Sequence, residues 1–78
     1  MRLVSFQVRT PVGTFVRIGA EREQAIIDLN MAYARYLADQ GEPRPRRLAD
    51  ALLPPTMSDF LGGGPPAMAA ARQALNHV

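Results

Sequence analysis

The stretch TFVRIGAEREQAIIDLNMAYARYLADQG, residues 14–41, decides the fold because its hydrophobic pattern changes once, near Asp28. Before that residue, two apolar runs are separated by the charged segment GAERE, which predicts a turn. The first run contains Phe15, Val16 and Ile18, and the second is QAIIDLN. Runs of β-branched and aromatic residues bounded by turn residues are typical of strands. This part of the stretch therefore predicts two strands joined by a tight turn.

From Asp28 onward the apolar residues follow the spacing of an α-helix. Either Asp28 or Asn30 can cap its N-terminus, because the side-chain oxygen accepts a hydrogen bond from a backbone N–H of the first turn. Gly41 ends the helix, since glycine readily adopts the left-handed conformation that follows a helix C-terminus. The stripe of this helix comprises Tyr33, Tyr36, Leu37 and Gln40.

A further strand precedes the stretch. In RLVSFQVR, residues 2–9, apolar and polar side chains alternate as in a half-buried strand. The turn TPVG follows, where Pro11 supplies the φ angle that the second turn position needs. Because both connections are short, we expect an antiparallel meander over residues 1–29. One face of the first strand carries Val4, Phe6 and Val8, and the other carries Leu3, Ser5 and Gln7.

Residues 30–78 predict three to four short helices. Pro45 suits the first turn of RRLADALL, and Pro54 and Pro55 end that helix. Thr56 is the expected N-cap of the next helix, with Asp59 three residues later as in a capping box. The expected buried residues are Leu48, Ala51 and Leu52 in the first of these helices, and Met57, Phe60 and Leu61 in the second.

The glycines at 62–64 end that helix, and the prolines at 65–66 begin the last one, AMAAARQALNHV. Met68, Ala71 and Leu75 mark its apolar stripe, and its small alanines permit close approach to the meander or to a neighbouring domain. The sequence therefore predicts one α+β domain over residues 1–78. Its small antiparallel sheet has three or slightly more strands, packed by three to four short helices.

Composition excludes several classes of protein. A chain of 78 residues buries roughly 60% of the surface that its unfolded form exposes, so a deep substrate pocket is not expected. The absence of cysteine rules out disulfides, a thiolate nucleophile and cysteine-based zinc sites, and it fits a cytoplasmic location. No apolar run is long enough to cross a membrane, and we expect neither export nor a membrane partner. Nine arginines, no lysines and seven acids give a net charge of +2, which identifies no partner by itself.

Side chains that could perform chemistry are few and scattered. His77, the only histidine, is predicted to be a helix-end or solvent residue, because a catalytic base or a metal site needs partners in fixed geometry. Ser5 and Ser58 lie in no nucleophile motif. We therefore assign no catalytic, cofactor-binding or metal-binding residue. The carboxylates fall on separate predicted elements with capping or surface roles: Asp28, Asp39, Glu42, Asp50 and Asp59.

Two short segments invite a binding interpretation. The segment RPRR, Arg44–Arg47, could contact phosphates, but it is short, neighbours Glu42 and Asp50, and has no interleaved aromatic residue to stack on bases. We interpret it as a solvated helix start. The segment GGGPP precedes a helix, yet its prolines lack the N–H groups that an anion would need, so it predicts a hinge.

Three ordered segments resemble the N-terminal domain of fumarylacetoacetate hydrolase family proteins: Ile27–Ala34, Ala51–Met57 and Phe60–Gly63. The similarity covers nearly the whole chain. In that family, a small N-terminal domain precedes a larger β-rich catalytic domain. Carboxylates of the catalytic domain bind Mg²⁺ or a similar ion, and its His and Glu groups activate water to cleave a carbon–carbon bond in acylpyruvate-like diketo acids. Some relatives decarboxylate or isomerise instead, and residues 1–78 match none of those functional positions.

The resemblance implies a non-catalytic domain that supports or covers the catalytic domain of its parent chain and contributes to subunit contacts in a homo-oligomer. It implies no cofactor in this chain and Mg²⁺ or Mn²⁺ in the catalytic domain, so the isolated chain should be inactive. Two alternatives stay open. One is a free-standing interaction or dimerisation module that uses Tyr33, Tyr36 and the alanine-rich faces. The other, less favoured, is a nucleic-acid binder that uses Arg44–Arg47.

Overall fold

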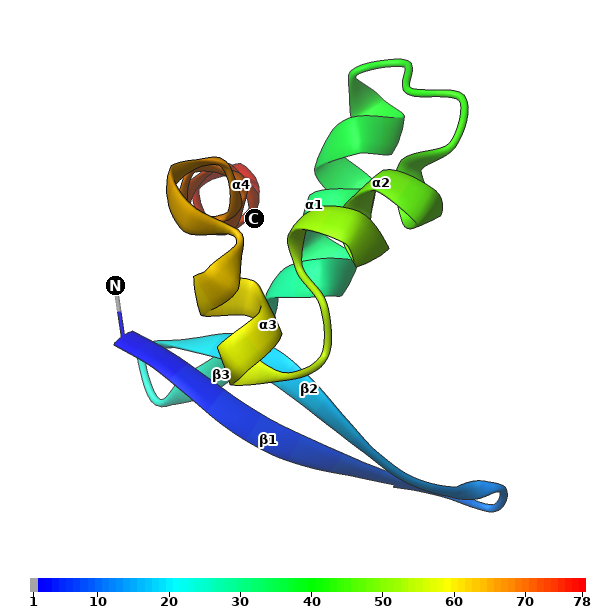
Figure 1. Ribbon diagram of the computed structural model, residues 1–78, viewed down its shortest axis with the longest axis vertical. Coiled ribbons are helices and arrows are strands. Elements are labelled where there is room, and N and C mark those ends of the chain that lie inside the picture. Colours follow the sequence, from blue (N-terminus) through cyan, green and yellow to red (C-terminus); the bar gives the residue numbers. More distant parts are fainter. Residues whose placement is uncertain (1) are drawn as a thin grey trace.

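The computed structural model describes residues 2–78 and consists of a small sheet with helices on one side (Figure 1). The strands are β1 (Arg2–Thr10), β2 (Gly13–Arg22) and β3 (Ala25–Asp28), all antiparallel, in the order β1-β2-β3. The helices are α1 (Leu29–Asp39), α2 (Pro45–Leu52), α3 (Met57–Gly62) and α4 (Gly64–His77). The predicted α+β class, with three antiparallel strands and short helices, is confirmed. None of the helices within residues 2–78 has the length and apolarity needed to cross a membrane.

Two tight turns join the strands. The first lies between Thr10 and Gly13, where the sequence predicts it. The second consists of Glu23 and Gln24, whose φ angles are 49° and 69°. Positive φ at both central residues is the geometry of a type I′ turn, whose twist matches that of the flanking strands. The segment GAERE, predicted as a turn, therefore lies mostly in β2 and gives only its last residue to the turn.

The strand register divides the sheet into two faces, because directly paired residues of antiparallel strands point to the same side. Leu3 pairs with Ala20, and Ala20 pairs with Ile27. These residues, together with Ile18, pack against the helices. The opposite side, which we call the outer face, carries the apolar residues Val4, Phe6, Val8, Phe15 and Ile26 together with the charged residues Arg2, Arg17, Glu21 and Asp28. The predicted grouping of the β1 residues agrees with the register, but the helices cover the side with fewer apolar β1 residues.

Helix α1 begins and ends as the sequence predicts. Asp28 is its N-cap, and the Asp28 carboxylate accepts a hydrogen bond of 3.2 Å from a first-turn backbone N–H. Asn30, the other candidate cap, lies inside the helix. At the C-terminus Gly41 has a φ of 87°, and the N–H of Glu42 donates to the carbonyl oxygen of Leu37 at 2.9 Å. This combination is a Schellman motif, which pairs carbonyl groups that the helix end would leave free.

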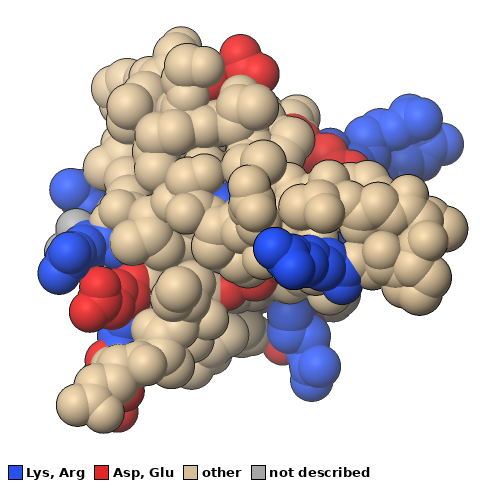
Figure 2. Space-filling view, turned by 90° about the horizontal axis from the view of Figure 1, so that it is seen from below, with Lys and Arg blue, Asp and Glu red and all other residues tan. Residues whose placement is uncertain are grey.

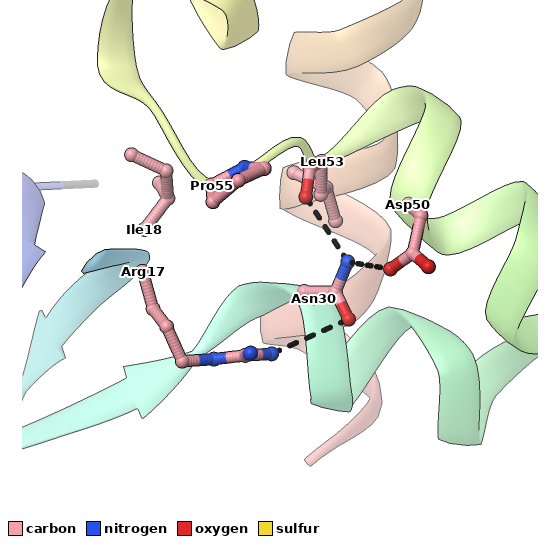
Figure 3. Close-up of a pocket in the computed structure, with 6 residues that line it drawn as sticks. All are labelled: Arg17, Ile18, Asn30, Asp50, Leu53 and Pro55. Carbon is pink, nitrogen blue, oxygen red and sulfur yellow. Dashed lines mark hydrogen bonds between the residues drawn. The ribbon is translucent and has the colours of Figure 1, made fainter. Parts of the chain in front are cut away.

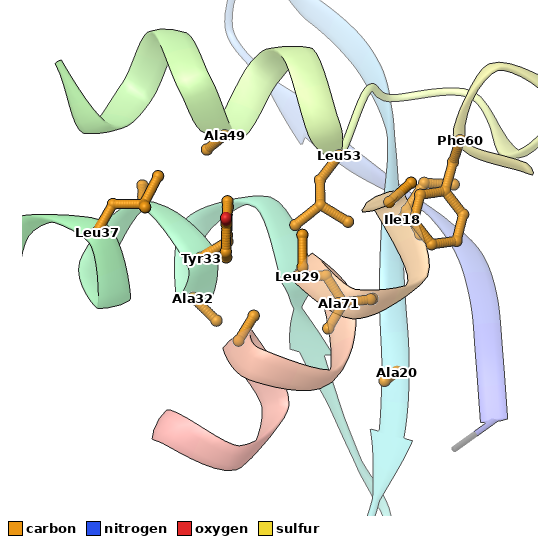
Figure 4. Close-up of a cluster of buried hydrophobic side chains, with 14 residues drawn as sticks. Ile18, Ala20, Leu29, Ala32, Tyr33, Leu37, Ala49, Leu53, Phe60 and Ala71 are labelled. Atoms are coloured by element: carbon orange, nitrogen blue, oxygen red, sulfur yellow. The ribbon is translucent and has the colours of Figure 1, made fainter. Parts of the chain in front are cut away.

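Helix α2 buries a different side from the one predicted. Its buried residues are Ala49 and, just after the helix, Leu53, which are 0% and 1% exposed and point toward α1 (Figure 4). Leu48 is 37% exposed, Ala51 is also exposed, and Leu52 is half-buried. Leu48 and Leu52 form one apolar pair four residues apart, and Ala49 and Leu53 form another, so the spacing alone is compatible with burial of either side of the helix. The prediction for Leu48 and Ala51 is wrong.

Helix α3 begins after Thr56, its predicted N-cap. The Thr56 hydroxyl donates a 2.7 Å hydrogen bond to the Asp59 carboxylate, and its side chain makes no bond to a backbone N–H. Phe60 is buried as predicted and Met57 is half-buried, but Leu61 is 57% exposed, so that prediction is wrong. A helix of six residues makes fewer than two turns, and only one of its sides can reach the core.

Helix α4 packs mainly against α1, which the sequence did not predict. A single residue, Gly63, separates it from α3. Met68 and Leu75 lie at the margins of the core. Because alanine has only a methyl side chain, the two helix backbones approach closely (Figure 4). The buried residues of α4 are Ala67, Ala70, Ala71 and Ala74.

Candidate functional site

A polar network lies at the sheet edge where β3 ends. The last residue of β3, Asp28, pairs with Gly19, so within residues 2–78 the part of β2 before Gly19 pairs only with β1. The side chain of Arg17 reaches Asp28 at this edge, and its Nε donates to Asp28 Oδ2 at 2.5 Å. A second bond runs from Arg17 Nη2 to Asp28 Oδ1 at 3.4 Å. The Asp28 carboxylate thus caps α1 and balances the charge of Arg17.

Asn30 extends this network into the helices. Its side chain is 8% exposed, and its Nδ2 donates to Asp50 Oδ1 at 2.9 Å and to the carbonyl oxygen of Leu53 at 3.0 Å. Its Oδ1 accepts from Arg17 Nη2 at 3.4 Å. These contacts come from β2, from α2 and from the residue that follows α2. One amide therefore joins the sheet to the second half of the chain.

The network lines an open cavity of about 340 Å³ beside β2 (Figure 3). The lining residues are Arg17, Ile18, Asn30, Asp50, Leu53 and Pro55. Half of them are polar and half apolar, and the Asn30 amide is fully used by its neighbours. The size suits a small polar molecule or one side chain of a partner.

The ionisable groups of this cavity are already engaged by neighbouring side chains. They are Arg17, which is paired with Asp28, and Asp50, which accepts from Asn30. The lining offers no nucleophile beside a base, the arrangement that group transfer would require. This site was not predicted from the sequence. The available signal was Asn30 itself, because a polar side chain just inside a helix that Asp28 already caps must find its partners elsewhere.

The outer face of the sheet is the other notable surface. Val8, Phe15 and Ile26 are 36%, 49% and 52% exposed. Gly19 lies beneath Phe6 and Ile26, and a Cβ atom at this position would be 2.6 Å from Ile26 Cγ2 and 2.9 Å from Phe6 Cε1. Phe6 and Ile26 therefore approach each other over Gly19, between the β2 residues Arg17 and Glu21 that share this face. Figure 2 views the molecule from this side of Figure 1, where uncharged residues dominate and arginines and acids are scattered between them.

His77 has a partner that the sequence did not indicate. Its Nε2 lies 2.7 Å from Asp39 Oδ2, and its ring packs nearly perpendicular to the Tyr36 ring with the centroids 5.3 Å apart. The bond with His77, followed by the charge of Arg35, lowers the pKa of Asp39. The pair joins the C-terminal ends of α4 and α1. No serine or cysteine lies in this cluster, so its evident role is to hold the two helix ends together.

The other candidate residues stay apart. Asp28, Asp50 and Asp59 serve the contacts described above, and Glu42 accepts a 3.4 Å hydrogen bond from a backbone N–H two residues later. Ser5 and Ser58 are both exposed. Within residues 2–78, no group of three or more His, Cys, Asp or Glu side chains is placed to hold a metal ion.

The arginine segment and the two tyrosines lie in different parts of the structure. Arg44–Arg47 spans the N-terminus of α2, with Arg46 Nη1 lying 2.8 Å from the sulfur of Met31. Tyr33 is 6% exposed and stacks on Tyr36 with ring centroids 5.7 Å apart. Burial is the main cause that raises the pKa of Tyr33. The structure therefore uses Tyr33 as a core residue, which removes it from any surface that a partner could reach.

Comparisons of this chain with protein-family models, with curated proteins and with solved structures each found no match. The likeness to the fumarylacetoacetate hydrolase family therefore depends on the three sequence segments named above.

Proposed function

We propose that this chain is a non-catalytic domain that packs through its outer face on a larger catalytic domain. We further propose that the pair belongs to the fumarylacetoacetate hydrolase family, with this chain as the N-terminal accessory domain. The observation that carries the proposal is the outer face itself. A three-stranded sheet with helices on one side leaves its more apolar β1 side uncovered, and such a face is the usual mark of a docking surface.

The free energy available from burying the outer face suits docking between two domains of one polypeptide. Complete burial of a Val, Ile or Phe side chain contributes about 1.5–3 kcal/mol. Because Val8, Phe15 and Ile26 are already partly covered, burying the remainder supplies roughly 3 kcal/mol in total. That gain is too small for tight binding between separate proteins. It suffices when a linker keeps the partner at an effective concentration on the order of millimolar.

The chemistry of the parent enzyme would reside in the larger domain. By the resemblance, that domain holds Mg²⁺ or Mn²⁺ and hydrolyses the carbon–carbon bond of an acylpyruvate-like diketo acid. The role of this chain would be to support or cover the catalytic domain. Its polar cavity beside Arg17 and Asn30 would then serve the packing of the two halves of this chain.

A first experiment assays the purified chain with acylpyruvates in the presence of Mg²⁺ or Mn²⁺. We expect no turnover above the rate with metal alone, since within residues 2–78 no group of three or more His, Cys, Asp or Glu side chains is placed to hold the metal ion that the reaction of the family requires. Turnover well above that rate would refute the assignment of a non-catalytic role.

A second experiment tests docking. The reading frame beyond the Val78 codon is sequenced, and the domain it encodes is purified separately and titrated with this chain by calorimetry. We expect Phe15→Ser to weaken binding about fivefold or more, because it removes a half-exposed phenyl ring from the interface. Leu61→Ser, which alters an exposed leucine on α3, is the matched control and should bind like the wild type. A stop codon after Val78, or equal weakening by both variants, would contradict the proposal.

A further inference from the structure

Strand β1 has an open edge along its whole length. The sheet order β1-β2-β3 places β1 at the margin, where it pairs only with β2 within the described residues (Figure 1). Its nine residues, Arg2–Thr10, pair with β2 in continuous register without a bulge. The backbone N–H and C=O groups directed away from β2 therefore form a template for another strand.

The usual devices that protect such an edge are absent from β1. Proteins block exposed edges with proline, lysine, bulges or charges in the middle of the strand. Strand β1 has no proline and no lysine, and its two charged residues, Arg2 and Arg9, lie near its ends. The five central positions, residues 4–8, carry only uncharged side chains. An edge with this composition is suited to pairing.

We infer that a second copy of this chain pairs with β1 in antiparallel orientation, so that the two sheets join into one sheet of six strands. A two-fold axis perpendicular to the sheet relates the copies, which makes the interface self-complementary. The axis also keeps both outer faces on the same side. Full overlap of the nine residues places Phe6 on the axis, opposite Phe6 of the second copy.

Most side chains match in this register. Val4 faces Val8 of the second copy on the outer face, and Ser5 faces Gln7 of the second copy on the other side. Arg2 meets the second copy's Thr10 and Leu3 meets its Arg9, so no two like charges lie opposite each other, and only the Leu3–Arg9 pair combines an apolar with a charged side chain. Cross-strand pairs of apolar with apolar and polar with polar residues are the favoured ones. A slip of one residue would direct apolar side chains to the wrong face, and a slip of two residues would shorten the overlap.

The association should be weak and specific. A single pair of strands buries less than the roughly 1,200 Å² typical of stable complexes, so we expect dissociation constants from tens to hundreds of micromolar. This inference does not depend on the proposed function, because the edge of β1 and the outer face are different surfaces. Pairing at the edge leaves the outer faces of both copies free for a larger domain.

The test is sedimentation velocity of the 78-residue chain from about 10 µM to about 1 mM, with two double variants at exposed positions. In the double variant Ser5→Glu with Gln7→Glu, the glutamate at each of the two positions faces a glutamate of the second copy, so two like-charged pairs form across the axis. In Ser5→Glu with Gln7→Lys, each glutamate faces a lysine of the second copy. Circular dichroism checks that both variants keep the wild-type fold.

We expect the wild type to dimerise with rising concentration, the Glu/Glu variant to dissociate about tenfold more readily, and the Glu/Lys variant to dimerise at least as well as the wild type. Only the register centred on Phe6 predicts this contrast, because a slip of two residues makes either Ser5 or Gln7 face its own counterpart. A wild type that stays monomeric at the highest concentration would overturn the inference. Equal dimerisation of the two variants would overturn it as well, as would dimerisation only in the presence of an added extended peptide.

Discussion

Replacing Asn30 by alanine tests whether the polar network holds the sheet to the helices. The Asn30 side chain makes three hydrogen bonds, two of them at 2.9 and 3.0 Å and one at 3.4 Å. Alanine removes all three. It also leaves the carbonyl oxygen of Leu53 and one oxygen of Asp50 without this donor. The bond to Leu53 is the buried one, since Asn30 is 8% exposed and Leu53 is 1% exposed.

The loss can be estimated from these contacts. The bond to the exposed Asp50 contributes about 0.5–1.5 kcal/mol net, and the buried carbonyl of Leu53 left without its partner costs about 1–3 kcal/mol. The Asn30→Ala substitution should therefore lower the free energy of unfolding by about 2–4 kcal/mol. A domain of this length is expected to have only about 4–12 kcal/mol in total, so the melting temperature should fall by about 10–25 °C.

Urea and thermal unfolding followed by far-ultraviolet circular dichroism measure this change. The matched control is Asn76→Ala, the same substitution at an exposed position of α4, which should alter the free energy of unfolding by less than about 0.5 kcal/mol. An Asn30→Ala protein that loses less than about 1 kcal/mol would show that the network contributes little and that our account of the site is incorrect.

Three further predictions concern packing and pH. Ala71→Leu, at a fully buried position between α4 and α1, should cost about 1–3 kcal/mol, while Ala69→Leu on the exposed side should be nearly neutral in urea unfolding. Gly19→Ala should lower the melting temperature, because the added Cβ atom would lie 2.6 Å from a neighbouring side-chain carbon and 2.9 Å from a backbone oxygen. The control is Gly62→Ala, which has open space around it and should keep or raise the melting temperature. The folded-state pKa of Asp39 lies below its ordinary value of 3.8, so its stabilising contribution is present above about pH 4 and lost as the pH falls further. The wild type should consequently lose more stability than Asp39→Asn between about pH 5 and about pH 3 in thermal melts, and identical losses would argue against the contact with the histidine.

The sequence predicted best those features that depend on neighbours along the chain. The capping role of Asp28, the stop at Gly41 and the start of α2 at Pro45 all follow from local backbone chemistry. Such signals need only the residue and its nearest neighbours. Both ends of α1 and the start of α2 were therefore predicted close to their observed positions, whereas the end of β2 was not, since GAERE lies mostly in that strand.

Features that depend on distant segments were harder to predict. Whether Leu48 or Ala49 faces the core is decided by where α1 lies, because both positions fit a helical stripe. The side of the sheet that the helices cover likewise depends on their path after Gly41. Nothing in the alternation along β1 distinguishes a face that packs on helices from one left for a partner. The sequence therefore could not show which face of the sheet the helices leave uncovered.

The central claim is that the outer face docks on a larger domain, and hydrogen–deuterium exchange tests it most directly. Exchange is compared between this chain alone, at a concentration where it is monomeric, and the same chain joined to the larger domain that we propose as its partner. Our account predicts slower exchange in peptides from β1 and β2, with unchanged exchange in peptides from α2. Unchanged exchange in β1 and β2, or slowing confined to α2, would contradict it.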